Sequence, residues 1–549
     1  MQSGKLKLGI MLDSFDAPAW VEGMIQRIVN GDSAYFALVV LKAAGDNYGF
    51  RHRNARIYSA FDRVDSRLFG RDPDPFSPKN VASLLSNAQT LIVSPIAVGD
   101  VSVLKEPDAI EIRKFHLDLL IKVGFEFLQC DNLRVSKFGI WYYYHGDDRV
   151  MRGGPPGFWE VVENKAETGA SLLATGCEEF ACQRVLYRSF FFTYPLSPAR
   201  HRSYYFWAAA SFMPRQLEYL QRFGKERFLR QTERFNTLPA CDAKRYETPK
   251  GFAAIKTIVK IMIRLLGEFF KRIFYLDQWY LLAGFGSNLP KKFGGFEKLM
   301  PPGDRFWADP HIVQVHGRYY IFIEEFLHTQ NRGRISVIEA DQFGRWKKPV
   351  VALEKEYHLS YPFVLHWQGK FYMIPESGEN RTIDIYECVE FPDKWEFKQS
   401  LMRDVKAVDS TLLHHAGKWW LFTAIAENEA AAPNYELFLF YADDLFAKEW
   451  KSHPQNPVVS DIKSARPAGD LFIEDGRLFR PSQDCSRMYG YGFDFNEIEV
   501  LSETEYSERR VSSIRPTWDK NVLATHTYSH QGNLMVIDAF RRKQKFWFS

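Results

Sequence analysis

The sequence is poor in cysteine, and its cysteines do not cluster. Six are scattered over 549 residues without a Cys-x-x-Cys pair: Cys130, Cys177, Cys182, Cys241, Cys388 and Cys485. This spacing is not that of a zinc site or of a disulfide framework. We therefore expect no structural metal, and a reducing compartment.

Long apolar runs and a strong net charge are also missing. No window of about 18 residues is both apolar and uncharged, so a membrane-spanning helix is not expected. The first residues, MQSGKLKLGIMLDSF, lack the apolar core of a signal peptide, which favours a cytoplasmic location. The stretch GIMLDSF has no Gly-x-Gly-x-x-Gly dinucleotide fingerprint, and the net charge of +4 argues against a nucleic-acid partner.

What the second half does contain is a repeated phrase: a Gly in a turn, usually a basic residue, and then an apolar run. The copies are HGRYYIF at Gly317, QGKFYMI at Gly369, AGKWWLF at Gly417, DGRLFRP at Gly476 and QGNLMVI at Gly532, spaced by 52, 48, 59 and 56 residues. A period of about 50 residues built from hairpins is typical of a β-propeller, with one blade per copy. The pattern predicts an all-β five-bladed propeller over residues 277–549.

The first half has the pattern of an α/β domain. Apolar stretches at 5–12 and 37–43 flank an amphipathic helical segment, and further strands are expected at 91–95 and 117–124. A strand, a helix and a strand at this spacing form a βαβ unit, which implies a parallel sheet. We assign residues 1–195 to this domain and residues 196–276 to a basic helical linker.

Residues 117–186 resemble the core of the formyltransferases that use formyl-tetrahydrofolate. An apolar strand leads to FGIWYYYHGDDRVMRGGPPGFWEVVENKAETGASLLAT, with a glycine-containing turn, a Trp-bearing helix and a Gly-Ala-Ser strand. The resemblance implies a formyl-polarising role for His145 and a folate cofactor. Tyr143 stands where the family has Asn, and Gln183 and Arg184 stand near its catalytic Asp. These departures favour a domain that keeps the fold without the reaction.

Residues 250–276 have the pattern of a basic amphipathic helix. Apolar residues recur at helical spacing from Ile255 to Leu266, with Lys256 and Lys260 among them. One interpretation is docking on an anionic membrane surface. The other is an interdomain helix that packs on the propeller, and the pattern does not decide between the two.

Two acids share a position within the repeat. Asp309 lies eight residues before Gly317, and Asp409 lies eight residues before Gly417. If the blades are equivalent, both carboxylates lie on inner strands and point to the central channel. Two carboxylates in one cavity are what glycosyl chemistry requires, because one acts as base or nucleophile and the other tunes or donates a proton. The alternative is that each Asp caps a local turn.

Other polar residues near the blade starts are predicted to contact substrate. They are Glu325, Glu376, Arg466, Arg480, Gln483, Asp484 and His526. Arg466 and Arg480 would clamp an anionic group, because guanidinium groups match phosphate and carboxylate geometry. Strand alternation prevents all of them from facing the axis, and Glu324 and Asp538 are given little weight as charges of the solvated kind.

The second half also resembles the amino-terminal domain of plant glucosamine inositolphosphorylceramide transferases, a five-bladed propeller related to arabinanases and fructosidases. The phrases that carry the resemblance are DRFWADPHIV, EEFLHTQNRGRISV, YPFVLHWQGKFYMIPES, VDSTLLHHAGKWWLFTA and ARPAGDLFIEDGRLFRPSQDC. The resemblance implies that Asp309 is a base and that Asp409 tunes a pKa. The glycosidase general acid would fall near Ala465 or Arg466, where no carboxylate stands.

The leading hypothesis is a glycan-active transferase in surface polysaccharide or glycolipid synthesis, peripheral on the inner membrane face, with Asp309, Asp409 and Arg466 as catalytic residues. No cofactor is required, and a nucleotide sugar is a candidate donor. One alternative is formyl or acyl transfer to an amino sugar through His145 and Tyr143. Another is a glycoside hydrolase-like or non-catalytic glycan-binding protein, because both scaffolds host several functions.

Overall fold

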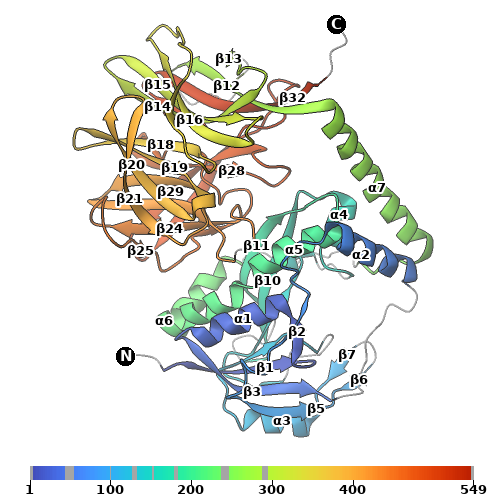
Figure 1. Cartoon of the computed structure of the whole chain (residues 1–549). Helices are drawn as coiled ribbons and strands as arrows, with labels where there is room; N and C mark the ends of the chain where they lie inside the picture. The colour runs from blue at the N-terminus through green and yellow to red at the C-terminus, as the bar shows by residue number, and fades with distance from the viewer. Residues whose placement is uncertain are drawn as a thin grey trace. The chain divides into compact units, whose positions relative to one another are not determined.

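The computed structural model describes residues 4–43, 55–98, 101–125, 133–150, 154–177, 183–236, 246–286, 293, 295–428 and 430–545. The chain divides into two compact units, Met1–Leu265 and Leu266–Ser549. Figure 1 shows the helices and mixed sheet of the first unit and the all-β second unit.

The first unit is built on a seven-stranded sheet with the strand order β11-β10-β9-β8-β1-β3-β5. Its strands are β1 (Leu6–Leu12), β3 (Ala34–Lys42), β5 (Gln89–Val93), β8 (Leu119–Lys122), β9 (Ile140–Tyr144), β10 (Glu167–Thr175) and β11 (Arg184–Phe192). The five strands from β9 to β5 pair in parallel, which confirms the predicted α/β class. β10 and β11 add an antiparallel edge, so the sheet is mixed rather than purely parallel.

Helices and two short ribbons complete this unit. They are α1 (Ala19–Asn30), α2 (Arg56–Phe69), α3 (Glu106–Arg113), α4 (Phe158–Glu163), α5 (Pro198–Ala209), α6 (Phe212–Glu233), a 3-10 turn (Asp148–Val150), β2 (Asp16–Pro18) with β4 (Pro78–Asn80), and β6 (Ile96–Val98) with β7 (Val101–Val103). α1 buries Val21, Met24, Ile25 and Ile28, the spacing of an amphipathic helix that covers a sheet. α5 contacts α2, and α6 contacts β11, so both helices belong to this unit.

Helix α7 (Gly251–Phe274) runs from the first unit into the second and is one unbroken helix in Figure 1. The helical periodicity of residues 250–276 predicts this element. Among the described helices, none is both long enough and apolar enough to cross a membrane.

The second unit consists of five antiparallel sheets, which confirms the predicted five-bladed propeller. Blade one consists of β14 (Arg305–Val315), β15 (Arg318–Leu327), β16 (Arg332–Ala340) and β17 (Val350–Leu353), and blade two of β18 (Ser360–Trp367), β19 (Lys370–Glu376), β20 (Thr382–Glu390) and β21 (Lys394–Arg403), with a 3-10 turn (Gly378–Asn380). Blade three consists of β22 (Ala407–His415), β23 (Lys418–Ile425), β24 (Glu436–Ala442), β25 (Lys451–Ser452) and β26 (Val459–Ser460), and blade four of β27 (Phe472–Glu474), β28 (Arg477–Asp484), β29 (Gly492–Leu501) and β30 (Tyr506–Ile514). Blade five consists of β31 (Tyr528–Gln531), β32 (Leu534–Gln544), β12 (Tyr275–Phe285) and β13 (Glu297–Leu299).

Blade five joins the two ends of the propeller sequence. β31 and β32 come from its carboxyl-terminal end, whereas β12 and β13 come from its start. β12 and β32 pair antiparallel from Tyr275 opposite Gln544 to Phe285 opposite Leu534. Because β12 carries no repeated phrase, the repeat alone does not reveal that this strand closes the ring.

The repeated glycines lie in the hairpin turns that the sequence predicts. In the first turn, His316 and Gly317 have φ values of 47° and 76°, and in the turns at Gly369, Gly417 and Gly476 the glycine and the residue before it also have positive φ values. Positive φ at both central residues is the type I′ turn, whose twist matches that of the flanking strands. Glycine is favoured at the second position because it has no Cβ to clash in this conformation.

We expect Gly417→Ala to lower the free energy of unfolding of the propeller by about 1 kcal/mol. A Cβ at Gly417 meets no atom within 4 Å, so the cost arises from the φ of 75° alone. Gly267→Ala in α7 is the matched control, because its surroundings are equally open and its φ is helical. Denaturant unfolding should show the control to be neutral or stabilising by about 0.5–1 kcal/mol. Equal losses in both variants would contradict the assignment.

Candidate active site at the propeller axis

The first unit has a cavity of about 430 Å³, and the propeller has one of about 280 Å³ that is lined by several of the predicted site residues. The propeller cavity receives side chains from blades one, two, four and five. Its lining consists of Trp279, Phe306, Ala308, Asp309, Glu324, His358, Ser360, Glu376, Arg466, Tyr489 and His526. Four of the predicted site residues, Asp309, Glu376, Arg466 and His526, thus meet in one cavity.

The inner strands of blades one, two and three carry the same bulge. The pairing register shifts once within each of β14, β18 and β22. The bulges hold Asp309, Tyr361 and Asp409, with φ values of 51°, 42° and 51°. A bulge re-aims a side chain, and positive φ at a non-glycine residue is a strained conformation found at functional sites. The eight-residue spacing to the turn glycine therefore identifies equivalent positions, and Tyr361 takes that position in blade two.

Tyr361 connects several blades through hydrogen bonds. Its hydroxyl group lies 2.8 Å from Thr411 Oγ1 and accepts a hydrogen bond of 2.9 Å from the backbone N–H of Gly469. Its own N–H faces Asp309 Oδ2 at 3.3 Å. These contacts connect blades one, two and three with the segment that enters blade four, so the strained residues are held by cross-blade hydrogen bonds.

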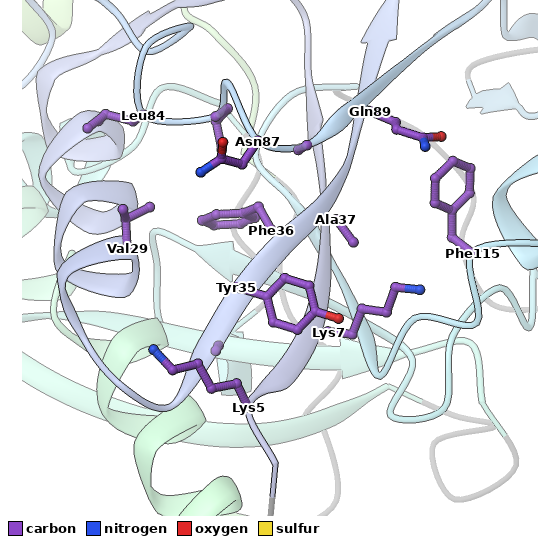
Figure 2. A pocket seen from close by; sticks show the side chains of 13 residues that line it. Lys5, Lys7, Val29, Tyr35, Phe36, Ala37, Leu84, Asn87, Gln89 and Phe115 are labelled. Atoms are coloured by element: carbon purple, nitrogen blue, oxygen red, sulfur yellow. The ribbon is translucent and has the colours of Figure 1, made fainter.

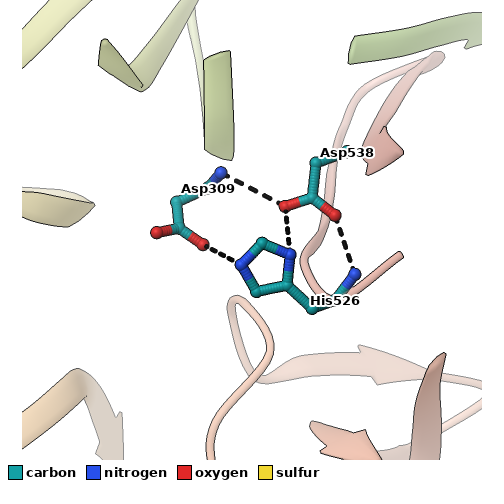
Figure 3. A group of neighbouring side chains, drawn as sticks. All are labelled: Asp309, His526 and Asp538. Atoms are coloured by element: carbon teal, nitrogen blue, oxygen red, sulfur yellow. Dashed lines mark hydrogen bonds and ion pairs between the residues drawn. The ribbon is translucent and has the colours of Figure 1, made fainter. Parts of the chain in front are cut away.

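His526 lies between two carboxylates (Figure 3). Its Nε2 is 3.1 Å from Asp309 Oδ1, and its Nδ1 is 2.8 Å from Asp538 Oδ2. Asp538 also accepts hydrogen bonds from the backbone N–H groups of Asp309 and His526, at 3.2 and 2.7 Å. Burial by itself would lower the pKa of His526, but Asp538 and Asp309 raise it to about 10. The ring is therefore an imidazolium at neutral pH.

The imidazolium keeps Asp309 ionised. Burial would raise the pKa of Asp309, but the charge of His526, a hydrogen bond of 2.7 Å from Thr527 and the charge of Arg466 hold it below its usual range. A buried carboxylate that is ionised and reaches a cavity is suited to act as a base.

Asp309, His526 and Asp538 also have the side-chain types of a metal centre. Ligand atoms of Asp309, His526 and Asp538 lie within 4.8 Å of one another. However, the two ring nitrogens of His526 face different carboxylates, and a metal ion would have to replace a proton that the raised pKa retains. The chemistry of this donor set fits an ion-paired cluster better than a metal site.

Arg466 is engaged by protein oxygens rather than left open toward a ligand. Its Nε and Nη2 atoms bind both carboxylate oxygens of Asp409, and Nη1 donates to Asn434 Oδ1 at 2.8 Å. Nη2 also lies 3.3 Å from Glu376 Oε2. Gln483 adds a hydrogen bond of 2.8 Å to Asp409. The predicted anion clamp is thus an internal ion pair, in which Arg466 neutralises the buried Asp409.

The surroundings of the cavity raise the pKa of two glutamates, Glu324 and Glu376, whereas they lower that of Asp309. Burial raises the pKa of Glu324 well above its usual range, and the negative charge of Asp309 adds to this shift. Burial and the nearby Asp409 raise the pKa of Glu376 as well, although Arg466 opposes the effect. Burial therefore favours the protonated form of both side chains, which is the form that can donate a proton.

Of the adjacent residues Glu324 and Glu325, the sequence analysis predicts Glu325 as a substrate contact, but Glu324 is the one that lines the cavity. Successive side chains of a strand point to opposite faces. Glu324 lines the cavity, whereas Glu325 binds Arg305 and Arg334 at 3.0 and 2.9 Å on the other side of β15. The Glu-Glu pair in FIEEF predicts an acidic residue near the axis, but only the register of β15 decides which of the two side chains faces it.

Arg480 and Asp484, which the sequence places among the substrate contacts, do not line the cavity. Arg480 is buried against Glu508, with a contact of 2.6 Å, and Asp484 pairs with Arg515 at 2.7 Å. Both pairs lie within blade four, where a buried charge requires an opposite charge. Asp538, in contrast, is predicted from the sequence to be a solvated charge, but the structure buries it fully beside His526.

The sequence analysis does not predict the aromatic residues Trp279 and Tyr489 as part of the site. The Trp279 ring lies 4.4 Å from the His526 ring, and the Tyr489 ring lies 4.9 Å from the Arg466 guanidinium. Trp279 belongs to the closing strand β12 and Tyr489 to the loop before β29, both outside the repeated phrases. Aromatic rings beside carboxyl groups suit a ligand with apolar C–H faces and hydroxyl groups, such as a sugar.

The predicted site of the first unit has no polar arrangement for formyl transfer. Tyr143 donates a hydrogen bond to the carbonyl group of Ala210 and accepts one from the N–H of Met213, both at 3.1 Å. Neither ring nitrogen of His145 has a partner among the described residues, and its ring stacks on Phe206 with centroids 3.7 Å apart. Burial lowers the pKa of His145 to about 3. The ring is packed as an aromatic residue.

The nearby acids do not replace the missing catalytic Asp. Asp148 pairs with Arg188 and accepts a hydrogen bond of 2.5 Å from Ser171, and Asp147 pairs with Arg149 at 2.9 Å. Arg184 donates to Thr232 and to a backbone carbonyl group. Each charged group is thus engaged elsewhere.

The cavity of the first unit lies at the amino-terminal ends of β1, β3 and β5 (Figure 2). Its lining includes Lys5, Lys7, Tyr35 and Gln89. In open α/β sheets, ligands bind at the carboxyl ends of the parallel strands. The position of this cavity therefore gives no support for a cofactor site in the first unit.

We predict that His526 makes stability depend on pH. Its folded pKa of about 10 exceeds the ordinary value of 6.5, so its contribution is complete below pH 6.5 and is lost as the pH rises toward 10. The loss should amount to a few kcal/mol, because one pKa unit corresponds to about 1.4 kcal/mol. Melting temperatures of the propeller from pH 6 to 10 should fall steeply in the wild type and less steeply in His526→Gln.

The control for this experiment is His366→Gln, which changes an exposed histidine of β18. It should keep the wild-type slope. A wild-type slope in His526→Gln would contradict the imidazolium assignment.

Residues 299–532 match the family model described as glucosamine inositolphosphorylceramide transferase 1, N-terminal. The chain is 35% identical over 206 residues to the protein named glucosamine inositolphosphorylceramide transferase 1 from Oryza sativa subsp. japonica, and 34% identical over 209 residues to that from Arabidopsis thaliana. These alignments cover 37% and 38% of this chain and 27% of each relative. The chain thus matches about a quarter of the length of these relatives.

Solved structures with a similar fold include glycoside hydrolases. One is Zg3597, a family 117 glycoside hydrolase of the marine bacterium Zobellia galactanivorans, with 15% identity, 49% of this chain and 90% of that chain covered, and a TM-score of 0.32. Another is an exo-1,5-alpha-L-arabinanase from a bovine ruminal metagenomic library, with 15% identity, 44% and 94% covered, and a TM-score of 0.31. The family match confirms the resemblance of the second half. It does not reach the first half, whose likeness to formyltransferases is unsupported.

Proposed function

We propose that the propeller is the catalytic unit of a glycan-active transferase, with the axial cavity as its sugar site. The observation that carries the proposal is that one cavity holds Asp309, whose pKa is lowered, together with Glu324 and Glu376, whose pKa values are raised. Carboxyl groups whose pKa values are driven apart by their surroundings are typical of acid–base catalysis. A volume of about 280 Å³ suits a single sugar ring.

In the proposed reaction, Asp309 accepts the proton of an acceptor hydroxyl group. The acceptor oxygen forms a bond to the anomeric carbon of the donor sugar, while the bond from that carbon to the leaving oxygen breaks. Glu324 gives its proton to the leaving oxygen, and the next cycle begins when solvent returns Asp309 and Glu324 to their starting states. Glu324 thereby supplies the general acid that a glycosidase would carry near Ala465 or Arg466.

The family match supports the substrate class within this proposal. The relatives that match residues 299–532 are named glucosamine inositolphosphorylceramide transferases, so we propose a sugar donor or acceptor linked to a lipid. Arg466 then serves as a positioning residue, because it holds the buried Asp409 and lies beside Glu376.

Replacing the proposed base or acid should abolish transfer. Removing one general acid or base commonly costs about 10²–10⁴-fold in rate, so Asp309→Asn and Glu324→Gln should each lose that much. Radiolabelled sugar donors and short glycolipid acceptors provide the assay. Glu396→Gln, on the exposed face of β21, is the matched control and should retain full activity.

The same panel separates the alternatives. Release of free sugar without acceptor would indicate hydrolysis. Ligand-induced change in tryptophan fluorescence without turnover would indicate a glycan-binding protein. Full activity of both Asp309→Asn and Glu324→Gln would place the reaction outside the propeller.

The pH dependence of transfer should identify the acid. The pKa of Glu324 is raised by burial and by Asp309, so the rate should fall on the alkaline side as Glu324 loses its proton. Because the pKa of Asp309 is lowered, the acid limb should lie below the ordinary range of aspartate. Residual activity of Glu324→Gln should lack the alkaline limb. If that limb disappears in Glu376→Gln instead, Glu376 is the donor.

A further inference from the structure

Helix α7 carries a stripe of exposed apolar side chains. Its members are between 44% and 80% exposed: Phe252, Ile255, Ile263, Leu266, Phe269 and Phe270. At about 100° per residue, these positions fall within an arc of about 120° on the helix surface. A contiguous apolar face of this kind marks a contact surface. We call these six residues the apolar stripe.

The apolar stripe is not the side of α7 that packs on the first unit. Ala254 and Ile261 are buried in a cluster with Tyr58 and Phe158. Arg264 donates to two backbone carbonyl groups of that unit at 2.7 Å. Since these contacts use a different face of the helix, the apolar stripe is left without a cover among the described residues.

Cations lie beside the apolar stripe in the first half of α7 and beyond its carboxyl-terminal end. Lys256 and Lys260 are exposed and lie beside the apolar stripe on the helix surface. Beyond the last residue of α7, Tyr275 lines a cavity of about 610 Å³ whose other walls include Lys298, Lys520, Arg541, Arg542 and Lys543. We call this the basic cavity.

Part of the basic cavity has no internal counter-charge. Lys298 pairs with Asp519 at 3.0 Å, and Arg541 donates to Gln278 at 2.8 Å. Within the described part of the chain, no carboxylate lies at ion-pair distance from Lys520 or Lys543. These two ammonium groups are therefore available to an external anion.

The apolar stripe and the basic cavity are held together at one end. Lys545, which follows β32, donates its N–H to the carbonyl group of Phe274 at 2.8 Å and its ammonium group to that of Arg272 at 2.7 Å. Cationic groups at a helix carboxyl terminus also complement the helix dipole. The end of α7 is thus anchored on the strand that lines the basic cavity.

We propose that this surface binds an anionic lipid bilayer. The apolar stripe enters the interfacial layer with α7 parallel to the membrane plane, and Lys520 and Lys543 contact lipid phosphate groups. An amphipathic helix with cations beside its apolar face binds membranes by buried apolar area and by attraction to anionic lipids. The combination of an apolar stripe with unpaired ammonium groups matches the acyl layer and the phosphate groups of an anionic bilayer.

Vesicle sedimentation with the full chain tests the proposal. The protein should sediment with vesicles of phosphatidylcholine mixed with phosphatidylglycerol, and much less with phosphatidylcholine alone. Phe269→Ser combined with Phe270→Ser should weaken binding to the anionic vesicles by about tenfold or more. Lys520→Ala combined with Lys543→Ala should reduce the preference for anionic vesicles and its sensitivity to salt.

Matched controls use surfaces away from α7. Phe343→Ser removes another exposed phenylalanine, and Lys394→Ala combined with Lys398→Ala removes two other lysines. Both should bind as the wild type does. Unchanged binding of the phenylalanine variant, or equal binding to both kinds of vesicle, would overturn the proposal. So would a dimer in sedimentation velocity that Phe269→Ser with Phe270→Ser converts to monomer.

Discussion

The ion cluster of Asp309, His526 and Asp538 joins blade one to blade five at the point where the propeller ring closes. Burying charged groups is costly unless each finds a partner, and here one protonated imidazole serves two carboxylates. The pairing of β12 with β32 brings these groups together, because it closes the sheet that carries Asp538. Ring closure and the ionisation of the proposed base thus depend on the same interaction.

The protonation pattern of the cavity follows from that cluster. His526 lowers the pKa of Asp309, and the negative charge of Asp309 adds to the burial that raises the pKa of Glu324. Arg466 is the ion-pair partner of Asp409 in blade three. A site that needs both a base and an acid obtains them from identical chemical groups, because the charges that surround them differ.

The axial cavity and the proposed lipid-binding surface are formed by different residues. The axial cavity is lined by residues of blades one, two, four and five, whereas the apolar stripe and the basic cavity involve α7 and the outer part of blade five. A transferase whose substrate carries a lipid would gain from contact with the membrane that holds that lipid. The proposed contact through α7 would not require the helix to cross the bilayer, since the apolar stripe occupies only one face.

The sequence by itself determined the number of blades, the α/β class of the first unit and the position of Asp309 and Asp409 on equivalent inner strands. These features are local, because hairpin turns and strand periodicity depend on residues that are consecutive in the chain. Tertiary structure alone decided which acids meet: Glu324 rather than Glu325, Asp538 beside His526, and Arg466 as the partner of Asp409. Strand register, ring closure and buried charge pairing set these contacts, and they join residues that lie far apart in the chain.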